Sequence, residues 1–115
     1  MTDISQLKQD ADNGNIDAMY SYAEELYMGE DIPKDAILGA RYMKMAADMG
    51  HVQAAEEYAE MCFTGEEIPM NKLEAAHYYK IAGDLGSENG AFNYALMLDD
   101  GDGIPQDKNE AFKYF

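Results

Sequence analysis

Few residues of this chain have the types and spacing that enzyme chemistry requires. Two histidines, His51 and His77, could act as a general base, and one cysteine, Cys62, could act as a nucleophile. Covalent catalysis needs a nucleophile, a base and a group that orients the base, all within reach of one another. No such set recurs in the sequence, and we therefore predict that the protein is not an enzyme.

Carboxylates are the other groups that could do chemistry, by holding a divalent cation. Acidic turns occur at Glu30-Asp31, at Glu66-Glu67 and in the segment Asp99 to Gly103, which reads DDGDG. This last segment does not match a calcium loop, because it lacks alternating aspartates followed by a glycine and by a glutamate six residues further on. We interpret all three as solvated turns, and we expect neither a metal nor an organic cofactor.

The composition is that of one small folded domain. The 115 residues are 47% hydrophobic and 27% charged, and the formal net charge is -15. Such a surface repels phosphate, so nucleic acids and anionic membranes are disfavoured as partners. A protein or peptide with basic segments would instead be attracted over long range. Plain solubility is the alternative explanation of this charge.

The sequence shows no pattern of export or membrane insertion. The N-terminus, MTDISQLKQD, lacks the basic start and the apolar centre of a secretory signal, and charges interrupt every apolar run. The single cysteine cannot form an internal disulfide and mildly favours a reducing compartment. We therefore expect a cytoplasmic location.

Glycines and Ile-Pro pairs recur every 36 residues. The recurring positions are Gly14, Gly50 and Gly86, then Gly29, Gly65 and Gly101, then Ile32-Pro33, Ile68-Pro69 and Ile104-Pro105. A period of this length is typical of a solenoid in which each unit packs mainly against its neighbours. We divide the single repeat domain, residues 1–115, into a half repeat (1–13), two whole repeats (14–49 and 50–85) and an incomplete repeat (86–115).

Each unit is predicted to contain two antiparallel α-helices, called here its first and second helix. Apolar residues recur at helical spacing in both halves of the unit: Ala18, Tyr22, Ala23 and Leu26, then Gly39, Ala40, Met43, Ala46 and Ala47. The glycine of each segment of the type GEDIPKD suits the end of the first helix, and the proline cannot continue that helix. The small residues allow the two helix axes to approach closely.

Polar residues are predicted to cap the second helices. Asp35, Asn71 and Asp107 follow each proline by two residues and can accept a hydrogen bond from the first turn. Glu74 and Glu110 lie three residues further on and would complete a capping box with Asn71 and Asp107.

The alignment of the units also accounts for two of the catalytic candidates. His51 aligns with Asn15 and Ser87, which are polar positions at the start of a helix, and this indicates a cap or a surface residue. Cys62 aligns with leucines in the other two copies. We therefore expect its thiol to be a buried, small hydrophobic group rather than a nucleophile.

The order of these residues resembles the Sel-one-like repeat (SLR) family, relatives of the tetratricopeptide repeat with a longer loop. The pattern is A-x-x-x-Y-A-x-x-L, then G-x-x-I-P-x-D, then A-x-Y-x-K-x-A-A-D-x-G, as found from Ala18 to Gly50. The resemblance implies an all-α fold, a right-handed α-solenoid of antiparallel helix pairs. It also implies a concave face lined by first helices, and the role of a non-catalytic adaptor or scaffold.

Under that resemblance, the concave face would present aromatic residues alternating with carboxylates. The candidate partner-binding residues are Tyr20, Glu24, Tyr27, Glu56, Glu60, Phe63 and Phe92. Such a surface suits a peptide or a partner domain with basic and apolar side chains, because aromatic rings provide contact area and cation-π contacts while carboxylates pair with Lys or Arg. The alternative is that some of these rings pack against the adjacent repeat.

Two features depart from the repeat pattern. Gly90 replaces the alanine found at Ala18 and Ala54, and we expect it to weaken the start of the third first helix by roughly 1 kcal/mol. The aromatic residues of AFKYF, from Ala111 to Phe115, have no following unit. They favour an alternative function, that of a structural spacer or a self-assembling segment of a longer array or multidomain protein, with self-association through this end.

Overall fold

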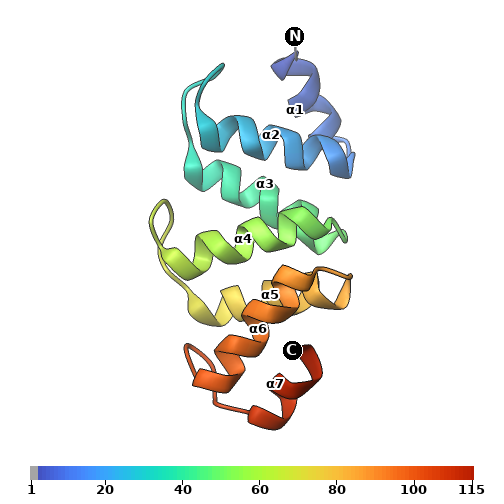
Figure 1. Cartoon of the computed structure of the whole chain (residues 1–115). Helices are drawn as coiled ribbons and strands as arrows, with labels where there is room; N and C mark the ends of the chain where they lie inside the picture. Colours follow the sequence, from blue (N-terminus) through green and yellow to red (C-terminus); the bar gives the residue numbers. More distant parts are fainter. Residues whose placement is uncertain (1–2) are drawn as a thin grey trace.

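The computed structural model describes residues 3–115, and it shows an all-α helical solenoid (Figure 1). The helices in this range are α1 (Ile4–Asp12), α2 (Ile16–Met28), α3 (Ala36–Asp48), α4 (Val52–Thr64), α5 (Lys72–Asp84), α6 (Glu88–Asp100) and α7 (Lys108–Tyr114). Each helix packs mainly against the helices before and after it in the chain, and the stack measures 47 × 25 × 19 Å. The first helices are α2, α4 and α6, and the second helices are α1, α3, α5 and α7.

The core consists of the predicted small residues together with tyrosines and methionines. Ala23, Ala59 and Ala95 are fully buried at equivalent positions of the three first helices. Met43 and Tyr79 occupy equivalent, buried positions on α3 and α5. Small side chains bring neighbouring helices together and large ones contribute most of the buried apolar area, so the predicted stripes are confirmed as the core.

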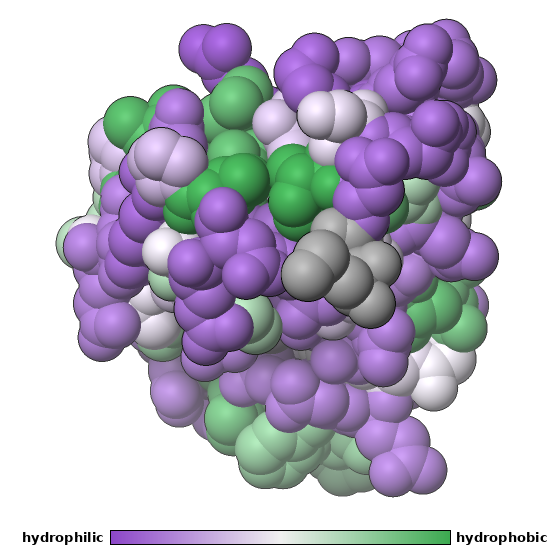
Figure 2. Space-filling model, turned by 90° about the horizontal axis from the view of Figure 1, so that it is seen from above, coloured by the Kyte–Doolittle hydropathy of each residue, from purple (hydrophilic) through white to green (hydrophobic). Residues whose placement is uncertain are grey.

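The α1 end of the stack presents a mostly polar surface. Viewed from above, the α1 end of the stack is covered largely by hydrophilic side chains, and hydrophobic ones gather in small areas between them (Figure 2).

The predicted glycine caps are confirmed. Gly29, Gly65 and Gly101 adopt left-handed backbone conformations with φ of 69°, 65° and 67°, and each ends a first helix. A Cβ atom at Gly29 would lie 2.5 Å from Cβ of Lys34, so glycine is also required there by the close return of the chain. Ile32 packs partly buried against the core and holds this loop to the helices.

The capping prediction is confirmed in one half and wrong in the other. The side chains of Asn71 and Asp107 accept hydrogen bonds from the backbone N–H groups of Glu74 and Glu110, at 3.0 and 2.9 Å. The reciprocal bonds of a capping box are absent among the hydrogen bonds of residues 3–115. The N–H of Asn71 donates instead to the carbonyl of Cys62, at 2.8 Å, and that of Asp107 donates to the carbonyl of Leu98, at 2.9 Å. Because the loop returns onto the first helix, this donor is already satisfied.

Gly90 has a different role from the one expected. It is buried where α6 meets α5, and a Cβ atom there would lie 2.7 Å from Cβ of Ala82 and 3.0 Å from the carbonyl oxygen of Tyr79. A Cβ atom at Gly83 would likewise lie 2.9 Å from Cα of Ala91. The lower helix propensity of glycine is therefore not the deciding effect, because alanine at this position would clash with α5.

A tyrosine and an aspartate join each second helix to the next. The hydroxyl of Tyr42 donates to Oδ1 of Asp12 at 2.6 Å, and Tyr78 donates to Asp48 at the same distance. Tyr114 makes the equivalent bond to Asp84 at 3.0 Å. In each unit the tyrosine ring also packs edge-on against a tyrosine of the first helix, in the pairs Tyr22–Tyr42, Tyr58–Tyr78 and Tyr94–Tyr114, with centroids 4.8–4.9 Å apart. The helix α1 thus contacts α3 through the same tyrosine–aspartate hydrogen bond that joins the later second helices to one another.

Candidate functional site

The first helices carry carboxylates and no basic residues. Each of α2, α4 and α6 contains three Asp or Glu residues, and none contains Lys or Arg. All eight Lys and Arg residues of the chain lie on second helices or in loops. The face that the first helices form therefore has a strongly negative potential, which attracts cations and repels anions.

A hollow of about 380 Å³ lies between α2 and α4 on this face. Four carboxylates line it, from Glu24, Glu57, Glu60 and Glu66. None of the four forms an ion pair with a Lys or Arg among residues 3–115. The hollow is thus an unneutralised acidic site.

Methionines line much of the apolar part of the hollow. Met28, Met43 and Met61 come from α2, α3 and α4, and Tyr27 and Thr64 complete the lining. Met43 and Met61 are buried, whereas Met28 is 58% exposed. Methionine is unbranched and polarizable, so this lining can adapt to an inserted aliphatic side chain.

Glu57 is a carboxylate of the hollow whose pKa this arrangement raises. Tyr20 stacks on His51 with ring centroids 4.4 Å apart, and its hydroxyl donates to Oε1 of Glu57 at 2.7 Å. Burial raises the pKa of Glu57, and the charges of Glu24 and Glu60 add to the effect, while the hydrogen bond from Tyr20 opposes it. A cation placed in the hollow would relieve this repulsion.

The chain's own lysines cover two of the expected aromatic anchors. Nζ of Lys34 lies 5.4 Å from the ring centroid of Tyr27 and 2.9 Å from Oε1 of Glu67. Nζ of Lys72 lies 5.0 Å from the ring centroid of Phe63 and 2.8 Å from Oδ1 of Asp102. These internal cation-π contacts tie the loop before α3 and the start of α5 to aromatic rings, so a partner's cation would have to compete for the same rings.

The seven candidate residues from the sequence do not form one site. Glu24, Tyr27 and Glu60 line the hollow between α2 and α4, and Tyr20 adjoins it through Glu57. Phe63 lines a second, smaller hollow of about 140 Å³ between α4 and α6, where it meets Tyr79 edge-on.

The other two candidates lie outside both hollows. Glu56 accepts a hydrogen bond from the hydroxyl of Ser87, which also caps α6. Phe92 is 52% exposed, and its ring centroid lies 5.9 Å from that of Phe115 at the α7 end of the stack.

Sequence reasoning missed Glu57 and two of the methionines. Glu57 lies one helical turn before Glu60, and this spacing is a signal that the two share a face. Met43 and Met61 are residues of the helix-helix interfaces, and their position at the base of a hollow depends on how α3 and α4 pack.

Two of the residues considered for catalysis, His51 and Cys62, have structural roles. Nδ1 of His51 accepts a hydrogen bond from the backbone N–H of Ala54 at 3.1 Å, which confirms His51 as a helix cap. Cys62 is buried as expected, and burial raises the pKa of its thiol. Within residues 3–115, no group of three or more His, Cys, Asp or Glu residues is arranged to hold a metal ion. No helix in this range is long and apolar enough to cross a membrane.

Comparisons with known proteins agree with this architecture. The family model described as Sel1 repeat matches residues 16–51, 52–87 and 89–115. Among solved structures, a protective antigen present in uropathogenic Escherichia coli strains, described as displaying an SLR fold, is 26% identical with a TM-score of 0.86 over 99% of this chain. A Sel1 repeat protein from Oxalobacter formigenes is 22% identical with a TM-score of 0.87 over 96% of this chain.

The chain is shorter than both of these proteins, spanning 24% of the first and 46% of the second. Cysteine-rich protein B of Helicobacter pylori is 17% identical with a TM-score of 0.67, and the match covers 98% of this chain and 86% of that one. No curated protein sequence matches the chain. The repeat period, the stacked helix pairs and three matched repeats together show that this chain belongs to the Sel1 repeat family.

Proposed function

We propose that this chain is a non-catalytic protein-interaction module that holds a peptide or partner domain with basic and apolar side chains against its first helices. Sel1 repeat proteins generally mediate protein interactions. The observation that carries the proposal is the hollow between α2 and α4, where four carboxylates gather and the two helices contain no Lys or Arg. Charge complementarity of this kind increases the association rate and selects the partner.

A Lys or Arg side chain of the partner matches both parts of the hollow. Its aliphatic stem would pack on Met28, Met43 and Met61, and its charged end would meet Glu24 and Glu60 at the rim. The positive charge of the partner would offset the repulsion among the carboxylates. Because salt screens the attraction between this charge and the carboxylates, binding is expected to weaken with added salt.

The test is fluorescence anisotropy with a labelled peptide of alternating Lys and Leu, and with the same peptide carrying Glu in place of Lys. We expect saturable, salt-sensitive binding of the Lys peptide only. Glu60→Lys reverses an exposed charge in the hollow, and Glu88→Lys reverses an exposed charge outside it. Only the first should weaken binding, by about tenfold or more. Equal affinities in the two variants would refute the proposal.

A second candidate function, a structural spacer or self-assembling segment, is favoured by the aromatic residues of α7. Phe112 is 84% exposed and Phe115 is 58% exposed, whereas Ala40 and Ala76, equivalent to Phe112, are buried. An exposed aromatic patch of this kind is typical of an interaction surface. Light scattering over a concentration series, with Phe112→Asp and Phe115→Asp as variants, separates this function from that of the interaction module. A monomer at all concentrations in the unsubstituted chain rules out self-association.

We further propose that the module acts in the cytoplasm and binds neither nucleic acids nor membranes. The free thiol of Cys62 and the net charge of -15 support this. Fractionation of source cells with an antibody to the chain tests the location.

A further inference from the structure

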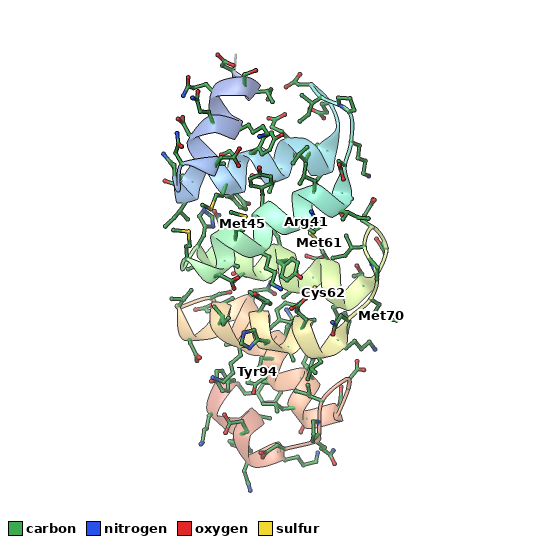
Figure 3. All side chains as sticks on the ribbon, turned by 180° about the vertical axis from the view of Figure 1, so that it is seen from behind. Arg41, Met45, Met61, Cys62, Met70 and Tyr94 are labelled. Carbon is green, nitrogen blue, oxygen red and sulfur yellow. The ribbon has the colours of Figure 1, made fainter. Side chains whose placement is uncertain are left out.

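The side of the solenoid formed by the second helices and the loops before them, called here its back, carries two hollows. They are built from equivalent residues of successive units. The first, about 450 Å³, lies between α3 and the loop before α5, and the second, about 460 Å³, lies one unit further on. Every residue that lines the first has its counterpart 36 positions later in the second, for example Ile37 and Leu73, or Tyr58 and Tyr94. Figure 3 shows this side, with Arg41, Cys62 and Met70 at the first hollow and Tyr94 at the second.

Packing explains most of this recurrence but not the residues at the mouths of the hollows. Tyr58 and Cys62 are buried, and Ile68 packs on the core, as such positions do in every unit. Ile37 and Leu73 are instead 58% and 67% exposed. The packing of the units leaves these two aliphatic side chains largely uncovered at the mouths of adjacent hollows, where they are available to contact another molecule.

The first hollow also has a free positive charge. Arg41 is exposed and forms no ion pair within residues 3–115. Lys44, in the same hollow, is 3.2 Å from Oε1 of Glu74, whose other oxygen accepts the hydroxyl of Tyr58. The guanidinium of Arg41 is therefore free to pair with a partner's carboxylate.

We propose that this back surface is a second docking site for a protein segment that carries two apolar side chains. One of these two residues is followed in the segment by a residue with a carboxylate. The apolar side chains fill the hollows beside Ile37 and Leu73, and the carboxylate pairs with Arg41. The acidic first helices, which carry no Lys or Arg, repel such a segment, whereas Arg41 on α3 attracts its carboxylate. The acidic face selects a basic partner, whereas the back site holds an apolar segment in its two hollows and orients it through Arg41, so both can be occupied at the same time.

The probes are fluorescein-labelled peptides with two leucines, the first followed by Asp, joined by Gly-Ser spacers of increasing length. In anisotropy titrations we expect at least one spacer to give saturable binding. Ile37→Asp and Leu73→Asp alter exposed side chains, so the fold should persist in circular dichroism and thermal melts. Each should weaken binding about tenfold or more. Arg41→Glu should do the same, and Arg41→Lys should retain most of the affinity.

Controls separate this proposal from that for the acidic face. Glu60→Lys, in the hollow between α2 and α4, should leave binding of the Leu-Asp peptide unchanged while it weakens the Lys-Leu peptide. Ile37→Asp should give the opposite pattern. The back site is refuted if no spacer gives saturable binding, or if folded Ile37→Asp and Leu73→Asp variants bind as the unsubstituted chain does.

Discussion

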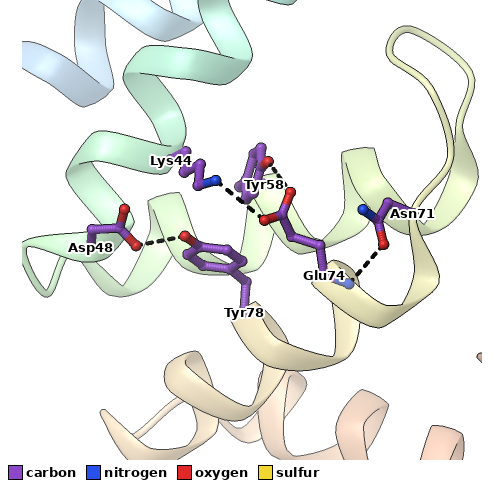
Figure 4. Close-up of polar contacts among 6 residues, drawn as sticks. All are labelled: Lys44, Asp48, Tyr58, Asn71, Glu74 and Tyr78. Atoms are coloured by element: carbon purple, nitrogen blue, oxygen red, sulfur yellow. Dashed lines mark hydrogen bonds and ion pairs between the residues drawn. The ribbon is translucent and has the colours of Figure 1, made fainter. Parts of the chain in front are cut away.

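The hydroxyl of Tyr58 donates a hydrogen bond to Oε2 of Glu74 across 2.6 Å, and Nζ of Lys44 lies 3.2 Å from the other oxygen of the same carboxylate (Figure 4). The three side chains come from α4, α5 and α3. The carboxylate of Glu74, which was expected to complete the capping box of its own helix, thus joins three helices and two repeats. Its hydrogen bonds lower the pKa of Glu74, that from Tyr58 most.

Replacing Glu74 by Gln should destabilise the chain at pH 7 by roughly 1–2 kcal/mol, because a charged acceptor is lost. Since the pKa of Glu74 is lower in the folded state than its ordinary value of 4.5, its contribution is present above pH 4.5 and disappears as pH falls through the lowered pKa. Urea unfolding at pH 7 and at pH 3 measures this, and the difference between the variant and the unsubstituted chain should shrink at pH 3.

The matched control for this change is Glu110→Gln. Glu110 is equivalent to Glu74 and similarly half-buried, but its side-chain partner is the exposed Lys113, at 3.4 Å, and it receives no tyrosine hydroxyl among the hydrogen bonds of residues 3–115. Its replacement should cost well under 1 kcal/mol. Equal losses for the two variants would show that the bridge to Tyr58 contributes nothing.

Replacing Gly90 by Ala should destabilise the chain by roughly 1–2 kcal/mol, although alanine is the better helix former by about 1 kcal/mol. The reason is the clash of the new Cβ with Ala82 on α5. Asn89→Ala, at the exposed neighbouring position, is the control and should be neutral or stabilising. An increase in melting temperature for Gly90→Ala would contradict the close contact of α5 and α6.

Replacing Lys34 by Ala should tighten binding of the Lys-Leu peptide by roughly threefold, a prediction that rests on the proposed acidic site. The change uncovers the ring of Tyr27 and frees Glu67, so a partner's cation meets no competitor. Lys108→Ala removes the same charge beside Asp99, away from the hollow, and should have little effect. Weaker binding for Lys34→Ala would mean that Lys34 orders the site rather than occupies it.

Binding of the Lys-Leu peptide should weaken as pH is lowered, and the loss should begin above the ordinary pKa of glutamate. Burial and neighbouring carboxylates raise the pKa of Glu57, so it gains a proton at a higher pH than an ordinary glutamate and the hollow loses a negative charge. Anisotropy titrations between pH 7 and pH 4 measure the effect. In Glu57→Gln the decline should begin at lower pH, and an unshifted profile would exclude Glu57 from the site.

The fold of this protein could be predicted from the sequence because its determinants are local and recur. Gly29 ends a helix through its own backbone conformation, and Asn71 caps one within the next turn. Three copies of such signals specify helix bounds, helix pairing and the core stripe. Ala23, Ala59 and Ala95 were expected in that core for this reason, and they are fully buried.

The tertiary structure decided which of the candidate residues meet. Glu24 and Glu57 lie on helices of different units, and Met43 reaches the same hollow from a second helix, so their proximity depends on the packing of α2, α3 and α4. Helical periodicity places a residue on a face of its own helix, but it does not give the distance between faces of separate helices. The sequence therefore determined the repeat and its core, while only the packing of one unit on the next decided the acidic hollow, the covering of Tyr27 by Lys34 and the paired hollows at the back.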